Sequence, residues 1–210
     1  MNSRHTIEAL CIRSDEVARK SGWVDDRNPA PYAIITALFH SELSEALEDY
    51  RNNKLVTEVW YECRGMAFGK DERDRSKEPP GDDPSYWKPC GVPSELADVC
   101  IRICQHVGTA GLSKKLQHAA NSPEVMNHGT HPFVFANFGE LLAEVHLSIS
   151  RAYLACTRSP HTSNYLVDLA IALRQVVAFC DASGIDLWAA IDEKEAYNRT
   201  RSFRHGGKKV

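Results

Sequence analysis

Two segments of the chain carry pairs of acidic residues at a helical spacing. Glu42 and Glu45 lie three positions apart, and so do Glu95 and Asp98. Residues three apart in an α-helix lie on one face, about one turn from each other, so each segment presents two carboxylates to the same side. If both segments are helices that pack together, the four carboxylates converge.

Four convergent carboxylates in a partly dry cleft imply a cation between them. Without one they repel each other and take up protons as they lose contact with water. Oxygen ligands of this kind suit Mg²⁺, with Mn²⁺ as a possible substitute. The sequence therefore predicts a metal site formed by Glu42, Glu45, Glu95 and Asp98. A single acidic pair is more often an exposed helix face, and only the second pair makes the metal site the better interpretation.

The elements that must position these acids are helices. Apolar residues recur with helical periodicity, and start and stop signals such as Thr6, Pro31, Ser94, Gly22 and Gly184 bound the segments. Six helices are predicted: residues 7 to about 21, 31 to about 53, 93 to about 107, 133–155, 165–182 and 187–198. The stripes expected to bury the acidic helices against each other are Leu38 and Leu47 on one, and Leu96, Val99 and Ile103 on the other.

The segments between the helices lack a clear period. Residues 64–83 are rich in charge, Gly and Pro, which predicts a long loop or lid, and residues 118–132 also read as irregular. No convincing strand is found, so the predicted fold class is all-α. Four aromatic residues flank the long loop and could either line a base pocket or anchor the loop: Trp60, Tyr61, Tyr86 and Trp87.

Composition sets further bounds. The 210 residues have 43% hydrophobic content and a net charge of −3, which predicts neither a stable nucleic-acid partner nor a membrane surface. The seven cysteines form no CxxC pair, and reduced thiols are expected. No apolar stretch has the length of a signal peptide or a membrane span, so a cytoplasmic protein is expected. Residues 202–210 form a basic tail.

The two halves of the chain resemble each other. Residues 37–46 align without gaps to 136–145, and residues 95–101 align to 165–171. Leu141 then stands where Glu42 does, and Tyr165 where Glu95 does. This predicts one domain over 1–210, with a first repeat at 31–112 and a degenerate second repeat at 133–201 that together form a four-helix core. Chance similarity between amphipathic helices is the alternative.

Read in order, with the long loop between them, the acidic pairs make the chain resemble the MazG-like all-α nucleoside triphosphate pyrophosphatase superfamily. Its members carry an ExxE helix followed by an ExxD helix. Residues 88–99 (KPCGVPSELADV) are similar to the family's approach to its second motif, and residues 194–208 (KEAYNRTRSFRHGGK) are similar to the KxxxNxxR element and HGGK tail of its phage and bacterial branch. The resemblance covers about residues 31–56, 86–112 and 165–209. It departs at Ser41 and Gln105, where many members have further acids.

The resemblance implies an enzyme that cleaves a nucleoside triphosphate between the α- and β-phosphates, giving the monophosphate and pyrophosphate. Glu42, Glu45, Glu95 and Asp98 would bind the metal, and either Glu42 or Glu45 would also act as general base. Substrate contacts would come from Lys194, Asn198 and Arg201 at the phosphates, and from Lys88 and Trp60. A homodimer is possible. The alternatives are a dUTPase-like or phosphoribosyl-ATP-like activity in the same fold, or a non-catalytic nucleotide sensor.

Overall fold

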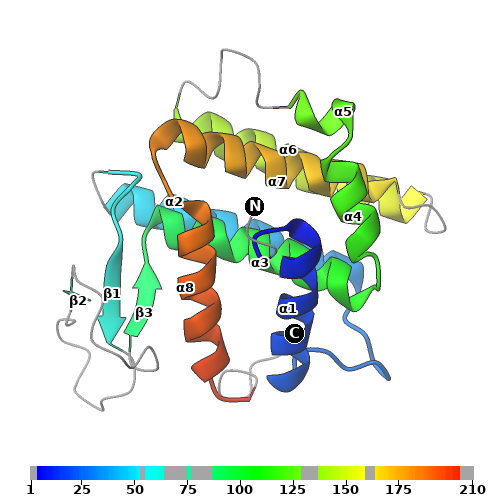
Figure 1. Cartoon of the computed structure of the whole chain (residues 1–210), viewed down its shortest axis with the longest axis horizontal. Coiled ribbons are helices and arrows are strands. Elements are labelled where there is room, and N and C mark those ends of the chain that lie inside the picture. Colours follow the sequence, from blue (N-terminus) through cyan, green and yellow to red (C-terminus); the bar gives the residue numbers. More distant parts are fainter. Residues whose placement is uncertain are drawn as a thin grey trace.

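The protein is predominantly helical, as predicted. The structure, a computed structural model, describes residues 4–52, 55–63, 75–76, 87–128, 137–158 and 164–203. Within these ranges it contains the following helices (Figure 1): α1 Ile7–Lys20, α2 Tyr32–Asn52, α3 Val92–Thr109, α4 Ser113–Ala120, α5 Pro123–Met126, α6 Phe138–Arg158, α7 Tyr165–Ser183 and α8 Leu187–Thr200.

Two pairs of long helices form the centre of the molecule. In Figure 1, α6 and α7 lie side by side above α2 and α3, and the pairs meet where α2 contacts α6 and α3 contacts α7. Helices α1 and α8 both pack on α3, whereas α4 and α5 pack on α7. This arrangement agrees with four core helices. Their origin as a repeat remains a prediction.

Local signals explain where several helices begin and end. The Thr6 hydroxyl accepts a hydrogen bond from the Ala9 N–H at 3.1 Å, and Asp186 caps α8 in the same way through the Ala189 N–H at 3.0 Å. Helix α7 ends at Gly184, whose φ of 73° is the left-handed conformation that glycine adopts without a Cβ clash. Thr6 and Gly184 are signals that the sequence indicates.

The prediction that the chain has no strand is wrong. In the part of the chain that the structure describes, three short strands form an antiparallel sheet in the order β2-β1-β3: β1 Trp60–Cys63, β2 Arg75–Ser76 and β3 Trp87–Cys90. Trp60 pairs with Cys90, and Cys63 with Trp87. Strands of two to four residues are too short to show an alternating pattern in the sequence.

The sequence also missed α4 and α5, which occupy most of 113–126, a region that includes part of the stretch read as irregular. Both helices are shorter than the window over which helical periodicity can be recognised. The predicted long loop falls outside the described residues, apart from β2. The predicted fourth helix is described from Phe138 onward.

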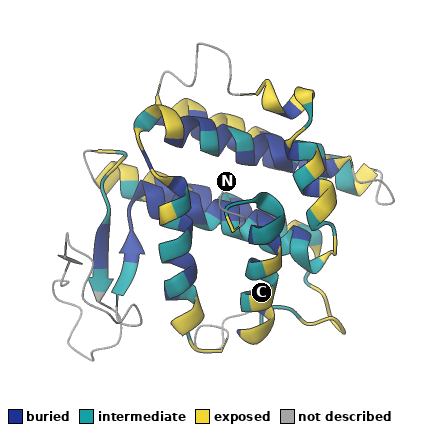
Figure 2. Cartoon of the chain, viewed as in Figure 1, coloured by how far each residue is buried: buried dark blue, intermediate teal, exposed yellow. Residues whose placement is uncertain are grey.

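Helix α3 has no exposed residue from Val92 to Thr109. Leu96, Val99 and Ile103 are fully buried, as expected, and dark-blue burial continues along much of the helix in Figure 2. The other predicted stripe is only partly correct. Leu38 is half-buried, and Leu47 is 41% exposed. Phe39 and Leu43 take the buried positions on α2 instead.

The entry to α3 depends on one glycine. Gly91 follows β3 and adopts a φ of 105°, which favours glycine. A Cβ there would lie 2.2 Å from the Glu58 carbonyl oxygen, so no larger residue fits. The Gly91 N–H donates to Asp49 Oδ2 at 2.7 Å. Helix α2 therefore fixes the start of the helix that carries the second acidic pair.

In the described residues, none of the helices combines the length and the apolar character needed to cross a lipid bilayer.

Candidate functional site

Three of the four predicted acids come together in the structure. One carboxylate oxygen from each of Glu42, Glu95 and Asp98 lies within 4.8 Å of the others. Glu42 projects from α2, and the other two acids project from α3, where the ExxD spacing places them one turn apart. Among the described residues this is the group whose ligand atoms lie close enough together that they could hold a metal ion. Three oxygens in this arrangement leave room for water or phosphate in the coordination shell of Mg²⁺.

Glu42 is buried at the α2–α3 contact. Its Oε1 accepts a hydrogen bond from Arg102 Nε at 2.9 Å. Burial and the nearby Asp98 carboxylate raise the pKa of Glu42 to about 7, although Arg102 opposes the shift. A group with this pKa exchanges a proton near neutral pH, so its charge depends on whether a cation is present.

Glu95 is paired with a buried lysine. Its side chain is 1% exposed, and Oε1 lies 3.2 Å from the ammonium of Lys194, which is also 1% exposed. The same ammonium lies 3.0 Å from Asp98 Oδ2. Burial alone would lower the pKa of Lys194, but Asp98 and Glu95 raise it above its ordinary value. Lys194 therefore stays charged and compensates two acids of the cluster.

The lysine is held by further acceptors. Lys194 Nζ donates to Ser94 Oγ at 2.9 Å and to the Pro89 carbonyl oxygen at 3.2 Å. The expected phosphate contact of Lys194 would require its ammonium to be accessible, yet here its hydrogen bonds go to protein groups. The structure thus places Lys194 beneath the carboxylates, as their counter-ion.

Glu45 lies apart from the other acids. Its side chain is 52% exposed, and the nearest cation is Lys88, with the two charged groups 3.8 Å apart. Lys88 also lies 3.4 Å from Glu95 Oε1. One turn of α2 separates Glu45 from Glu42, so Glu45 stands at the solvent side of the cluster. Lys88 links this outer acid to the buried ones.

Asn198 and Arg201 lie beside the cluster at the end of α8. Asn198 Nδ2 approaches Asp98 Oδ1 at 3.4 Å. The Arg201 guanidinium lies 5.7 Å from the centre of the Tyr197 ring, over its face. Both residues line a small cavity.

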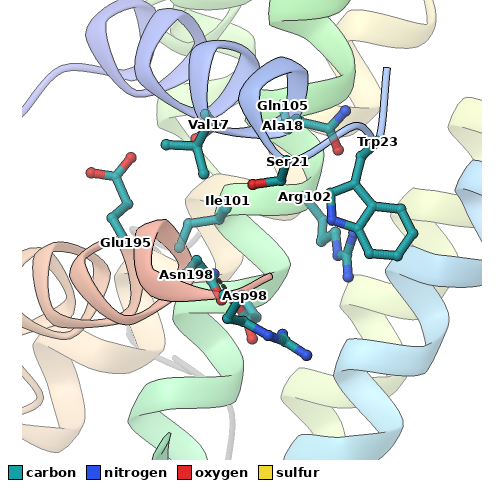
Figure 3. A pocket seen from close by; sticks show the side chains of 12 residues that line it. Val17, Ala18, Ser21, Trp23, Asp98, Ile101, Arg102, Gln105, Glu195 and Asn198 are labelled. Atoms are coloured by element: carbon teal, nitrogen blue, oxygen red, sulfur yellow. Dashed lines mark hydrogen bonds between the residues drawn. The ribbon is translucent and has the colours of Figure 1, made fainter. Parts of the chain in front are cut away.

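This first cavity has a volume of about 60 Å³ and lies between α1, α3 and α8 (Figure 3). Three buried oxygen atoms on its lining residues make no hydrogen bond within the described structure: Ser14 Oγ, Glu195 Oε1 and Asn198 Oδ1. Buried polar atoms are rarely left without partners. A guest that donates hydrogen bonds, such as a hydroxyl group or water, would satisfy them.

A second cavity of about 310 Å³ lies between α2, α3 and the segment after α1. Trp23, Arg102 and Gln105 line both cavities, and Figure 3 shows the Trp23 indole beside the Arg102 side chain. Phe39 and His106 add an aromatic wall. Burial lowers the pKa of His106 to about 4, so this wall is neutral near pH 7. The space suits a flat, partly apolar group.

Trp60 and Tyr61, which the sequence suggested as either base-pocket or anchoring residues, lie in the small sheet and away from the acids. Trp60 and Tyr61 are 6% and 8% exposed and belong to β1. Neither lines the two cavities beside the acids. Tyr61 Oη instead donates to Glu193 on α8 at 2.6 Å, which ties the sheet to that helix. Of the two interpretations offered by the sequence, anchoring is the one that these contacts favour.

Two residues that line both cavities were not among the site residues predicted from the sequence: Arg102 and Trp23. Arg102 lies four positions after Asp98, so the same helical periodicity that paired the acids could have found it. Trp23 follows the end of α1 in a segment without a period, and its place beside α3 depends on tertiary packing. No local signal pointed to it.

The segment predicted to be a degenerate second repeat carries an apolar and an aromatic residue where two acids of the cluster would be. Leu141 is fully buried where the first repeat has Glu42, and Tyr165 is 8% exposed where it has Glu95. Tyr165 packs edge-on against Tyr32, with ring centres 5.8 Å apart. Both positions belong to the apolar core.

Comparison of the chain with family models, with curated proteins and with solved structures gives no match in any of the three.

Proposed function

We propose that the protein is a Mg²⁺-dependent nucleoside triphosphate pyrophosphohydrolase. It would cleave the substrate between the α- and β-phosphates and release the monophosphate and pyrophosphate. The observation that carries the proposal is the meeting of Glu42, Glu95 and Asp98 beside two cavities that share the Arg102 side chain. A cluster of carboxylates next to a space of nucleoside dimensions suits a metal-bound polyphosphate.

Each acid has a chemical task in this proposal. Glu42, Glu95 and Asp98 would hold Mg²⁺, which would neutralise the charge of the phosphates and activate water. Glu45, 52% exposed at the edge of the cluster, is placed to take the proton from the attacking water. Water then forms a new P–O bond, the bridging P–O bond breaks, and pyrophosphate leaves.

The basic residues divide between two tasks. Lys88 has a 15% exposed side chain at the solvent side of the acids, and Arg201 lines the first cavity, so both are candidates to bind phosphate oxygens. Lys194 would keep the buried carboxylates ionised and correctly oriented. This assignment differs from the sequence-based one, in which Lys194 itself contacts phosphate.

The nucleoside would occupy the two cavities. Trp23 and the aromatic wall of the second cavity favour a stacked base. The acceptor oxygens of Glu195 and Asn198 in the first cavity favour a sugar hydroxyl. This placement replaces the predicted contact with Trp60.

The test is a product analysis with purified protein. Each canonical NTP and dNTP, together with dUTP and phosphoribosyl-ATP, is incubated with Mg²⁺ or Mn²⁺, and pyrophosphate and orthophosphate are measured separately. Pyrophosphate with a monophosphate product supports the proposal, and the preferred nucleotide separates the housecleaning role from the dUTPase-like and phosphoribosyl-ATP-like alternatives. Orthophosphate with a diphosphate product would contradict it. Asp98→Asn serves as the inactive control.

A non-catalytic nucleotide sensor is the second candidate. It is favoured by the ion pairs of Lys194, which compensate Glu95 and Asp98 without any metal. Calorimetry distinguishes the two functions. A sensor would bind nucleotide in the absence of Mg²⁺ and would release no product. The proposed partners are otherwise limited to the nucleotide and a possible second copy of the chain.

A further inference from the structure

A third cavity lies on the opposite side of α3 from the acid cluster. Its volume is about 170 Å³, and helices α1, α3, α4, α5, α7 and α8 contribute residues to it. Cys100 and Cys104 of α3 line it, whereas Asp98 and Arg102 on the other face line the first cavity. A shift of two residues turns a helix by about 200°, so the two cavities lie back to back across α3. We call this space the rear cavity.

The walls of the rear cavity are almost entirely apolar. Leu10, Leu173 and Ile191 are typical of its lining and are 4% exposed or less. Burial raises the pKa of the Cys100 thiol, so the α3 wall is uncharged. Closely packed protein interiors contain few voids larger than a water molecule, and an apolar void of about 150 Å³ accepts a guest of six carbons such as benzene. The rear cavity is of that size.

Two polar groups stand out on this apolar lining. Arg174 Nε is buried and makes no hydrogen bond in the part of the chain that the structure describes. Arg174 forms no salt bridge with another described residue, so no described carboxylate lies within ion-pair distance of its side chain. Arginine cannot lose its charge in a protein, so a buried Nε–H without an acceptor is unfavourable.

Asn121 supplies a second donor at the rim. Its Oδ1 accepts a hydrogen bond from Gln117 Nε2 at 3.2 Å, and this leaves Nδ2 as the group available to a guest. Asn121 and Met126 are both exposed, so the cavity reaches the surface on the side of α5. A guest entering there would bury its apolar part and keep its polar end at the rim.

We propose that the rear cavity binds a small apolar carboxylate with a body of about six carbons. The body fills the apolar space, and the carboxylate accepts hydrogen bonds from Arg174 Nε and Asn121 Nδ2. An ammonium group is disfavoured by the fixed guanidinium charge, and a neutral alcohol leaves Nε without an ionised acceptor. A nucleotide is too large and too polar for this space.

The position of the rear cavity would let such a ligand influence the acid cluster. Cys100 lies two residues after Asp98, and Ile191 lies three residues before Lys194. Both residues are buried and line the rear cavity. Cys100 shares α3 with Asp98, and Ile191 shares α8 with Lys194. Filling the cavity would restrict the motion of α3 and α8 against each other.

The test uses three probes that share one six-carbon chain: hexanoate, 1-hexanol and hexylamine. Their binding to the full-length protein is measured by calorimetry and by ligand-observed NMR, with no nucleotide or metal present, so the result does not depend on the proposed function. We expect hexanoate to bind about tenfold more tightly than hexanol, as one charge-assisted hydrogen bond implies, and hexylamine not to bind.

Two variants locate the binding. Arg174→Met should reduce hexanoate affinity to that of hexanol, whereas the control Arg158→Met, at an exposed position on α6, should leave both unchanged. Ala170→Leu fills the cavity with a larger side chain and should abolish binding of both probes. Circular dichroism verifies that each variant is folded. If Ala170→Leu fails this control, chemical-shift changes confined to Trp188 and its neighbours on the cavity wall give the location in the wild type.

Three outcomes would overturn the inference: no binding of hexanoate, equal affinity for hexanoate and hexanol, or unchanged hexanoate affinity in the Arg174→Met protein.

Discussion

Lys194 and Asp98 form a buried ion pair in which Nζ lies 3.0 Å from Oδ2. The lysine side chain is 1% exposed, and the aspartate is 16% exposed. The acid cluster is therefore partly neutralised by the protein itself. A substitution at the cluster that removes one charge should therefore affect the stability of the protein, because it leaves an oppositely charged partner behind.

Lys194→Met should destabilise the metal-free protein. It leaves Glu95 and Asp98 without their shared cation, and breaking a buried ion pair from one side costs about 3–5 kcal/mol of unfolding free energy. Mg²⁺ should restore part of this loss, since it supplies the missing positive charge. Chemical denaturation with and without Mg²⁺ measures both effects. Lys114→Met, an exposed position on α4, should show neither.

Glu45→Gln should separate activity from stability. The side chain is 52% exposed and outside the buried cluster, so its unfolding free energy should change by less than about 0.5 kcal/mol. Its kcat for pyrophosphate release should fall by about 100-fold if Glu45 takes the proton from water. The neighbouring Glu48→Gln, also exposed on α2, is the matched control. Full activity of the Glu45→Gln protein would remove it from the mechanism.

Glu42 should make the stability of the metal-free protein depend on pH. Its pKa rises from an ordinary value of 4.5 to about 7 on folding. Between these values the unfolded chain is ionised while the folded protein keeps its proton. The contribution of Glu42 to the free energy of unfolding is therefore fully present below about pH 4.5. It declines by up to about 3 kcal/mol as the pH rises to about 7.

The Glu42→Gln variant isolates that contribution, because glutamine resembles the protonated acid. Without metal, the difference in unfolding free energy between wild type and Glu42→Gln should be small near pH 4.5 and should grow as the pH rises to about 7, with Glu42→Gln the more stable protein. Saturating Mg²⁺ should reverse the trend, since metal binding favours the ionised carboxylate. A difference that does not change with pH would mean that Glu42 is ionised throughout.

Trp23→Ala should raise KM more than it lowers kcat. Trp23 lines both cavities beside the acids, so its loss removes binding contact and leaves the acids in place. Trp60→Phe should leave KM unchanged, because Trp60 is buried in β1 outside these cavities. Steady-state kinetics on the preferred nucleotide compares the two. An unchanged KM for Trp23→Ala together with a raised KM for Trp60→Phe would instead support the base pocket that the sequence suggested around Trp60.

Glu144→Gln and Asp168→Asn should retain most of the activity. In the predicted repeat they align with Glu45 and Asp98, but Leu141 and Tyr165 stand at the positions where two further acids would be needed, and both are buried. Metal titration should give the same stoichiometry for wild type and Asp168→Asn. Fewer bound ions in the variant would show that the second repeat contributes a site of its own.

The sequence predicted those parts of the molecule that follow from local periodicity. The six longest helices and the convergence of Glu42, Glu95 and Asp98 are examples, because a 3.6-residue period determines which side chains share a face. It did not predict the short strands or α4 and α5, whose stability comes from tertiary contacts. Nor did it predict that Lys194 lies under the acids, since that position depends on how α8 crosses α3.

The enclosure of α3 has a consequence for native-state hydrogen exchange. Helices α1, α2, α7 and α8 and strand β3 all pack on it. Its amides in the stretch from Glu95 to Val107 should thus exchange only through global opening of the protein, among the slowest in the chain. The segment bearing Glu95 and Asp98 would then be ordered before any ligand arrives, and binding would involve little loss of backbone entropy there.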